Sequence, residues 1–385
     1  MIRIGERMRP LYGEGARPVD DTRPAQGNAG LWYDKFCNTW SAQWRLDASG
    51  DGHEKGKASP KLGWIETVTG GSVGDPRLLR EASYRVALLT KQLGGRSAVY
   101  DAQSRFVTGL GRRHPVENGF AWHPTLGVPY LPGSSLKGLV RAWASANGTS
   151  AEECAGLFGP AEGPAAVGRV SFLDAIPLRE VRLEADVMTP HFAQWTVTDP
   201  PGDWGSPTPV PFLVTAAGTQ LLFSIVPAGP PREREAIALD MDRASEWLES
   251  ALQHSGAGAK TAVGYGRYAR NAPATKKHLD EVARRGDEAN KALLSKTPLG
   301  RWKIVIDSKP EREVYDLALK HLAKEPIADL IDRRAFIEAL SAKGFVDAWR
   351  RGRPLGAHLD VGVKKLKERA AQIDAALAAL KDRAI

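Results

Sequence analysis

The chain changes character near residue 274, and this change limits the folds that are open to it. Before that point, short runs of β-branched and aromatic residues alternate with stretches of helical periodicity. These strands and helices interleave without the strict spacing of repeated β-α-β units, which favours an α+β domain over a doubly wound sheet. Beyond that point the sequence is rich in Ala, Leu, Lys and Glu, a composition typical of helices. We therefore predict a mixed domain followed by a mainly α-helical extension.

Local signals predict individual elements within this outline. Asp75 followed by Pro76 is typical of a capped helix start, and a helix at 236–253 is predicted from its periodicity. Apolar runs between turn residues predict strands at 169–173, 182–187, 211–215 and 220–226. For the extension we predict one strand at 302–306 among helices at 276–295, 311–324, 327–350 and 358–381. The predicted division of the chain is a flexible arm at 1–28, a mixed domain at 29–272 and the extension at 273–385.

The aromatic residues near the N-terminus recur at helical spacing. They are Trp32, Phe36, Trp40 and Trp44. We expect them to form one packed face rather than a platform for stacking bases.

The distribution of charge is more informative than its total. A formal net charge of +8 and an isoelectric point near 9.4 are compatible with a polyanionic partner and also with a well-solvated surface. Residues 1–270 carry 29 Lys and Arg against 28 Asp and Glu, whereas residues 271–385 carry 24 against 17. The mixed domain would therefore bind a polyanion through local clusters and backbone geometry rather than through its net charge.

Composition argues against several classes of protein. No run of about 18 apolar residues could span a bilayer, and the Arg-rich N-terminus lacks the apolar segment of a secretory signal. We therefore predict a cytoplasmic protein without a membrane partner. The two cysteines, Cys37 and Cys154, are far apart, and no pair of histidines has metal-ligand spacing. We predict neither a bound metal nor another cofactor.

Residues 127–141 (GVPYLPGSSLKGLVR) combine several residue types that bind phosphate. A Pro-Gly turn would deliver Ser134 or Ser135 as the N-cap of a helix whose first-turn amides are unpaired. Lys137 and Arg141 lie four residues apart and would share one face of that helix. Hydroxyls, amides and two cations would then converge, as in a phosphate clamp. The alternative is a well-capped amphipathic helix with two solvated cations.

Residues 256–268 (GAGAKTAVGYGRY) form a second segment of this kind. Its four glycines within eleven residues allow another backbone to approach closely. Tyr265 or Tyr268 could stack on a base. The segment is not a P-loop, because that motif needs glycine at two positions that hold Ala and His here. The side chains suited to contact phosphate are Lys260, Thr261 and Arg267.

These two segments resemble the signature segments of the RAMP superfamily of CRISPR proteins. Residues 127–141 are similar to the RAMP motif that opens a helix, and residues 256–266 are similar to the RAMP C-terminal glycine-rich loop. Within the superfamily, residues 186–192 (DVMTPHF) resemble a D-x-x-T-P-H-aromatic segment of the sixth-subunit family of type III-B (Cmr) effector complexes. Residues 207–214 and 31–36 resemble two further elements of that family.

The resemblance covers about residues 30–270 and implies a modified RRM-like, ferredoxin-like core with loop insertions. It also implies a non-catalytic subunit at one end of a Cmr filament, near the 3′ part of the CRISPR RNA. The implied partners are CRISPR RNA, target RNA, the backbone RAMP subunit, the small helical subunit and a neighbouring RAMP subunit. The extension after about residue 273 departs from the compact family pattern.

The resemblance assigns RNA contacts to residues of the two signature segments and to a basic loop at 105–114. The resemblance of the DVMTPHF segment also assigns an RNA contact to His191. The full set is Arg112, Arg113, Ser134, Ser135, Lys137, Arg141, His191, Lys260, Thr261, Gly264, Tyr265, Gly266 and Arg267.

Two other functions remain open. A RAMP-type, metal-independent endoribonuclease would process guide precursor RNA with His123 or His191 as general base and Lys137 as charge stabiliser. A purely structural cap would instead contact neighbouring subunits through the basic extension.

Overall fold

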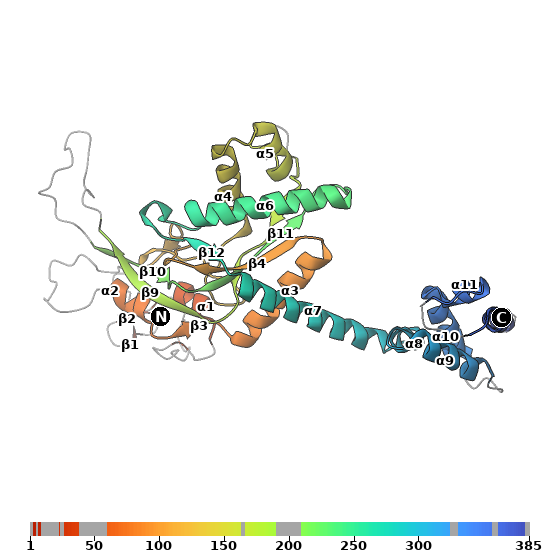
Figure 1. The fold of residues 1–385 in the computed structure, drawn as a ribbon. Helices are drawn as coiled ribbons and strands as arrows, with labels where there is room; N and C mark the ends of the chain where they lie inside the picture. Colours follow the sequence, from red (N-terminus) through yellow and green to blue (C-terminus); the bar gives the residue numbers. More distant parts are fainter. Residues whose placement is uncertain are drawn as a thin grey trace, which may run out of the picture. The chain divides into compact units, whose positions relative to one another are not determined.

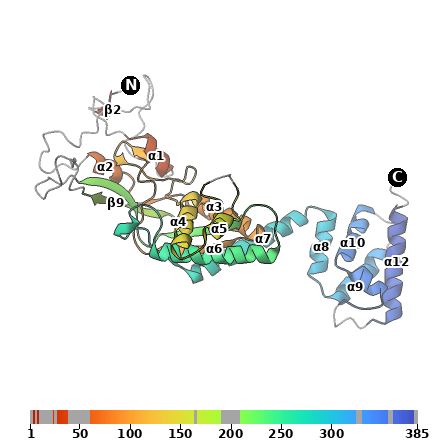
Figure 2. The same ribbon diagram turned by 90° about the horizontal axis from the view of Figure 1, so that it is seen from above.

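The structure, a computed structural model, describes residues 3–4, 7–8, 23, 27–37, 60–162, 166–189, 209–323, 330–355 and 361–381. It divides into two compact units, Met1–Val282 (unit 1) and Ala283–Ile385 (unit 2). Each unit has its own hydrophobic core. Figures 1 and 2 show the elements of both units from two directions. The domain boundaries predicted at 28/29 and 272/273 stay predictions.

The centre of unit 1 is an antiparallel sheet with the strand order of a ferredoxin-like core. Across the sheet the order is β12, β4, β11 and β7, which are the fourth, first, third and second of these strands along the chain. Helices α4 and α5 (Ala151–Phe158) lie between the first strand and the second, and α6 joins the third to the fourth. Helices α4 and α6 therefore fill the two helix positions of the β-α-β-β-α-β pattern. The predicted α+β, ferredoxin-like class is confirmed. The bounds are β4 Arg96–Ala102, α4 Gly133–Ala146, β7 Val170–Phe172, β11 Gln220–Pro227, α6 Arg234–His254 and β12 Tyr268–Arg270.

Both faces of this sheet are covered. Because side chains alternate along a strand, Tyr100 of β4 packs with Met241 of α6 on one face. Its neighbour Val99 packs with Ala87 of α3 (Pro76–Gln92) on the other. An RRM presents aromatic side chains on its sheet for stacking with RNA bases. Since α3 covers the face opposite α4 and α6, bases cannot stack on the central sheet here (Figure 1).

A smaller sheet and two short helices complete the core of unit 1. In this sheet β9 lies between β10 and β3, and α2 packs on it. Trp32 of α1 stacks on Phe36 at 5.5 Å between ring centroids and on Trp64 of α2 at 5.8 Å. The expectation of a packed aromatic face is confirmed for Trp32 and Phe36, whereas Trp40 and Trp44 lie outside the described residues. The bounds are α1 Ala29–Lys35, α2 Pro60–Glu66, β3 Ser72–Val73, β9 Val181–Met188 and β10 Val210–Thr215.

The remaining elements of unit 1 are short. They are β1 Arg3–Ile4, β2 Arg7–Met8, β5 Arg113–His114, β6 Glu117–Asn118, α5 Ala151–Phe158, β8 Ile176–Pro177 and the 3-10 turn Thr261–Val263. Cys37 and Cys154 are buried free thiols. None of the helices in the described residues is both long and apolar enough to cross a membrane.

The described residues of unit 2 form helices joined by turns, without a strand. Its core encloses Phe336 and Trp349, both fully buried. The helix α7 begins in unit 1 and ends in unit 2. The bounds are α7 Ala272–Leu294, α8 Pro298–Asp307, α9 Glu311–Ala323, α10 Leu330–Ala342, α11 Phe345–Arg350 and α12 Val363–Lys381.

Two predictions for the extension are wrong. Residues 302–306 form part of α8 rather than a strand, because Thr297 caps the helix and Pro298 occupies its first position. A short apolar run has no period long enough to separate the two alternatives. The single helix predicted at 327–350 is divided into α10 and α11 at Gly344, which has a φ of +80° that favours glycine.

Candidate nucleic-acid interface

Three segments that are far apart in the sequence meet around one hollow in unit 1. The hollow, about 420 Å³ in volume, is lined by the loop 108–111, by Leu131 and one flank of α4, and by residues 256–259 and Thr261 of the glycine-rich loop. We call it the loop hollow. Ser135 and Thr261 are among its lining residues. The two segments that resemble RAMP motifs are therefore brought together in space.

The glycine-rich loop is held against the segment that follows β4. The Ala259 amide donates to the Val107 carbonyl oxygen at 2.8 Å. Gly258 has a φ of +105°, and a Cβ atom there would lie 2.4 Å from the same oxygen. The close backbone approach expected from the glycines is confirmed, because no side chain fits at this position.

Two of the predicted phosphate-binding arginines bond to the main chain instead. The Arg267 guanidinium donates to the carbonyl oxygens of Ser255 at 2.5 Å and Thr261 at 3.2 Å. It therefore braces the two sides of the glycine-rich loop. Arg141 donates to the Gly159 carbonyl oxygen at 3.2 Å. Their predicted RNA contacts stay predictions.

The predicted serine cap of α4 is wrong. The helix begins at Gly133 with Pro132 in the N-cap position, which places Ser134 and Ser135 within the first turn. The Gly133 amide donates to Asp174 Oδ1 at 2.7 Å. A carboxylate thus occupies the helix N-terminus where a phosphate was predicted. Ser135 faces the loop hollow from the flank of the same turn.

The basic side chain of Lys260 lies away from the loop hollow. Its Nζ is 3.9 Å from Met188 Sδ and 5.4 Å from the centroid of the Phe212 ring. These partners belong to β9 and β10. Lys260 adopts a left-handed backbone conformation, with a φ of +60°. It is not among the residues that line the hollow, whereas its neighbours Ala259 and Thr261 are.

Tyr265 lies beside the same two strands. Its hydroxyl donates to Asp186, which also pairs with Arg105 at 2.8 Å. Burial and this hydrogen bond raise the pKa of Tyr265 to about 12, so the hydroxyl stays protonated at neutral pH. The ring contacts Phe212 with 6.2 Å between centroids. The alternative stacking residue, Tyr268, is buried, so its predicted base stacking is wrong.

The other predicted residues differ in exposure. Arg112 and Arg113 are exposed next to Gly111, which lines the loop hollow. Ser134 and Gly264 are exposed, Lys137 is half-buried and Gly266 is buried. His191 lies outside the described residues.

His123 stabilises a local turn. Its Nδ1 accepts from the Leu126 amide at 3.3 Å and lies 3.2 Å from the Thr125 hydroxyl oxygen. Burial lowers the pKa of His123, while the nearby Asp174 acts in the opposite direction. His123 is not among the described residues that line the loop hollow.

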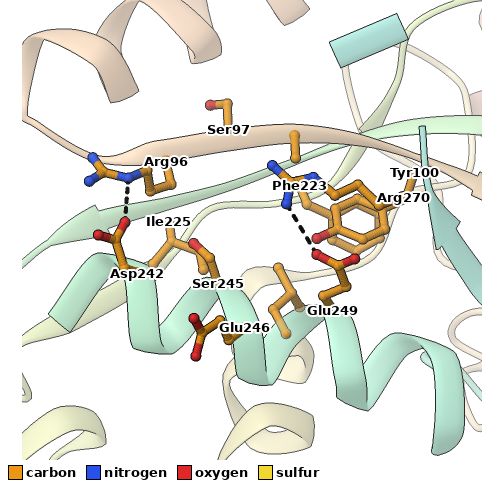
Figure 3. A pocket seen from close by; sticks show the side chains of 12 residues that line it. Arg96, Ser97, Tyr100, Phe223, Ile225, Asp242, Ser245, Glu246, Glu249 and Arg270 are labelled. Atoms are coloured by element: carbon orange, nitrogen blue, oxygen red, sulfur yellow. Dashed lines mark hydrogen bonds and ion pairs between the residues drawn. The ribbon is translucent and has the colours of Figure 1, made fainter. Parts of the chain in front are cut away.

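A second hollow, about 260 Å³ in volume, lies between α6 and the central sheet (Figure 3). Its arginines are already paired. Arg96 bonds to Asp242 at 2.8 Å, and Arg270 bonds to Glu249 at 3.2 Å. With Glu246 also in the lining, carboxylates outnumber arginines, so this hollow does not suit a phosphate.

Sequence reasoning missed two acidic residues that organise the site. Asp174 fixes the start of α4, and Asp186 holds both Arg105 and Tyr265. Asp186 opens the DVMTPHF segment, so a signal existed for it. No local pattern marks Asp174, because its partner Gly133 is 41 residues away in the chain.

Comparison with known proteins shows which superfamily this region is similar to. Residues 99–269 match the model of the RAMP superfamily, which confirms the resemblance seen in the sequence. This region contains all three segments that line the loop hollow. The match spans 171 of the 385 residues of the chain.

The chain is also similar to the CRISPR system Cmr subunit Cmr6 of Pyrococcus furiosus. The identity is 28%, and the match covers 44% of this chain and 66% of that protein. Among solved structures, a chain of the type III-B Cmr-beta complex bound to cognate target RNA is 23% identical, with a TM-score of 0.45 over 55% of this chain and 71% of that one. Cmr6 from Pyrococcus furiosus is 23% identical, with a TM-score of 0.32 over 46% of this chain and 97% of that one.

Proposed function

We propose that this chain is an RNA-binding subunit of a cytoplasmic type III-B CRISPR effector complex. It binds the 3′ part of the CRISPR RNA, caps one end of the backbone filament, and contacts target RNA and neighbouring Cmr subunits. It does not cleave RNA itself. The match to the RAMP superfamily and the similarity to Cmr6 support this assignment.

The loop hollow is the observation that carries the proposal. Its lining combines the hydroxyls of Ser135 and Thr261 with glycine-rich backbone, and such groups recognise phosphate and ribose rather than base edges. Arg112 and Arg113 are exposed beside it. Because the central sheet is covered on both faces, we place the RNA at the loop hollow rather than on that sheet. Binding should tolerate any sequence and weaken as salt rises.

A charge placed in the loop hollow tests this proposal. Ser135 is exposed in the first turn of α4, and Ala146 is exposed in the last turn of the same helix. A carboxylate near the N-terminus of a helix is stabilising, so Ser135→Glu should not unfold the domain. We expect it to weaken the binding of single-stranded RNA about tenfold, or about 1.4 kcal/mol, by repelling phosphate. Ala146→Glu adds the same charge away from the hollow and should leave affinity unchanged.

Fluorescence anisotropy with labelled RNA at several salt concentrations measures both variants. Equal affinities for Ser135→Glu and the unsubstituted protein would contradict RNA binding in the loop hollow.

The endoribonuclease alternative makes a different prediction. Since the Nδ1 of His123 is engaged within its own turn, we expect no discrete cleavage when the pure protein is incubated with repeat RNA without metal. Discrete products that disappear in His123→Ala would favour the enzyme instead.

A further inference from the structure

Unit 2 contains a pocket that the RAMP resemblance does not cover. The pocket, about 760 Å³ in volume, lies between α9 and the start of α12. We call it the α9–α12 pocket. Its charged lining consists of four cations and two carboxylates, so positive charge is in excess. These residues are Arg312, Lys364, Lys365, Arg369, Asp316 and Glu368.

The most buried of these cations lacks an anionic partner. Arg369 is only 8% exposed, and its Nε has no hydrogen-bond partner. Its Nη1 donates to the neutral amide of Gln372, and its guanidinium lies 5.2 Å from the centroid of the Tyr315 ring. A buried charge without a compensating anion is costly. An anion that enters the pocket would relieve this cost.

Three other cations of unit 2 are paired with carboxylates. Lys309 contacts Glu313 at 2.5 Å, Lys343 contacts Asp307 at 2.6 Å, and Arg350 contacts Asp374 at 2.7 Å. In the part of unit 2 that the structure describes, no comparable ion pair involves the four pocket cations. Their positive charge is therefore not neutralised by neighbouring carboxylates at contact distance.

The backbone and the apolar lining add to this chemistry. Gly362 lies just before α12 and borders the pocket, as do Lys364 and Lys365 in the first turn of that helix. The N-terminus of a helix favours an anion. Leu319 and Val361 also line the pocket, and Leu319 is 39% exposed. Apolar side chains beside clustered cations suit a phosphate that is attached to a sugar and a base.

We propose that the α9–α12 pocket binds a phosphate of single-stranded RNA, with its sugar or base against Leu319 and Val361. Arg369 and the first-turn amides of α12 hold the phosphate, and Lys364 and Lys365 contact it or its neighbour from the exposed rim. This inference rests on the proposed function and gives the extension a role in holding the RNA. An acidic protein segment would share the cations but would lack the attached ring.

The test uses the full chain and a matched pair of double variants. Lys364→Gln with Lys365→Gln removes two exposed lysines from the pocket rim. The control, Lys320→Gln with Lys367→Gln, removes two exposed lysines from the same two helices outside the pocket lining. All four side chains are exposed, so the fold should be retained, and thermal melting checks this.

We expect the rim variant to bind labelled single-stranded RNA about tenfold more weakly near 0.1 M salt. Loss of two phosphate contacts should lower the slope of log K against log salt by about 1.4. In the control, the changes in RNA affinity and in this slope should each be less than half of those in the rim variant. Inorganic phosphate and AMP, titrated by calorimetry, show whether a free phosphate suffices or an attached nucleoside is needed. Polyglutamate competition tests the acidic protein alternative.

The outcomes separate this inference from the proposed function. If Ser135→Glu weakens RNA binding and the rim variant behaves like its control, the pocket assignment falls while the proposed function stands. If only the rim variant weakens binding, the pocket assignment stands and the loop hollow loses its role. Binding of polyglutamate, but not of RNA, that depends on the rim lysines would overturn the RNA assignment.

Discussion

Two glycines of the glycine-rich loop should respond differently to the same substitution. Both have positive φ, +105° at Gly258 and +94° at Gly264. A Cβ at Gly258 would lie 2.4 Å from the Val107 carbonyl oxygen, whereas nothing lies within 4 Å of one at Gly264. Gly264→Ala should cost about 1 kcal/mol of unfolding free energy from backbone strain. Gly258→Ala should cost at least about 2 kcal/mol, because the clash adds to that strain.

Urea unfolding of both variants measures this difference. Equal losses would show that the loop can move away from Val107 without cost.

A buried histidine should make the stability of unit 1 depend on pH. His114 Nδ1 accepts from the Val116 amide at 3.2 Å, and Nε2 lies 3.0 Å from the Tyr33 carbonyl oxygen. Burial lowers the pKa of His114, and the positive charge of Lys35 lowers it further. The hydrogen bond to the Tyr33 carbonyl acts in the opposite direction. Asp34 Oδ1, 4.0 Å from Nε2, is the anion nearest to the ring among the described groups.

The direction of the effect follows from the lowered pKa. The unfolded chain binds a proton near pH 6.5, and the folded chain binds it only at lower pH. Unfolding therefore becomes easier as pH falls below about 6.5, until the folded pKa is also passed. Thermal melting between pH 8 and pH 5 should show this decline, and His114→Gln should make it shallower. An unchanged pH profile in His114→Gln would assign the decline to other groups.

The sequence identified residues of the site more reliably than it predicted the groups to which their side chains bond. The sequence identified Ser135 and Thr261, which do line the loop hollow. It predicted phosphate contacts for Arg141 and Arg267, which stay predictions, but it did not predict the hydrogen bonds that both form with carbonyl oxygens of the protein. A cation at a helical or loop position has the same sequence signature in either case. Only the position of a distant carbonyl, such as that of Gly159, decides between them.

At the level of elements, α8 offers a direct test of helix against strand. The Thr297 hydroxyl accepts from the Gly300 amide at 3.0 Å, which caps the helix. Thr297→Ala should therefore destabilise unit 2 by about 1 kcal/mol, and Thr297→Ser should retain most of the stability. If residues 302–306 formed a strand, neither change would matter. The calorimetric unfolding transition of unit 2 in the full chain measures the effect of both variants.

Long, strongly patterned elements were predicted well from the sequence. The strands at 182–187 and 220–226 and the helix at 236–253 correspond to β9, β11 and α6 within two residues at each end. The errors occur where a second local signal or a contact between residues distant in the sequence overrides the predicted pattern. The start of α4 was moved by the non-local bond between Gly133 and Asp174, which no periodicity contains.

For the whole molecule, the strand order was predictable only through the family resemblance. The apolar runs predicted where the strands lie in the sequence but not which strands pair with one another. The order β12, β4, β11 and β7 depends on pairings between residues far apart in the sequence, such as Leu222 with Val99, 123 positions away. The loop hollow follows from this order, since it needs the segment after β4, the start of α4 and the loop before β12 at one place.

Separate cores in the two units predict separate unfolding transitions. Leu221 and Leu340 are both fully buried, the first in unit 1 and the second in unit 2. Either Leu→Ala change should cost about 2–5 kcal/mol, because it leaves a cavity. Leu221→Ala should shift only the calorimetric transition of unit 1, and Leu340→Ala only that of unit 2. The helix α7 spans both units, so a change in both transitions from a single substitution would mean that it couples their folding.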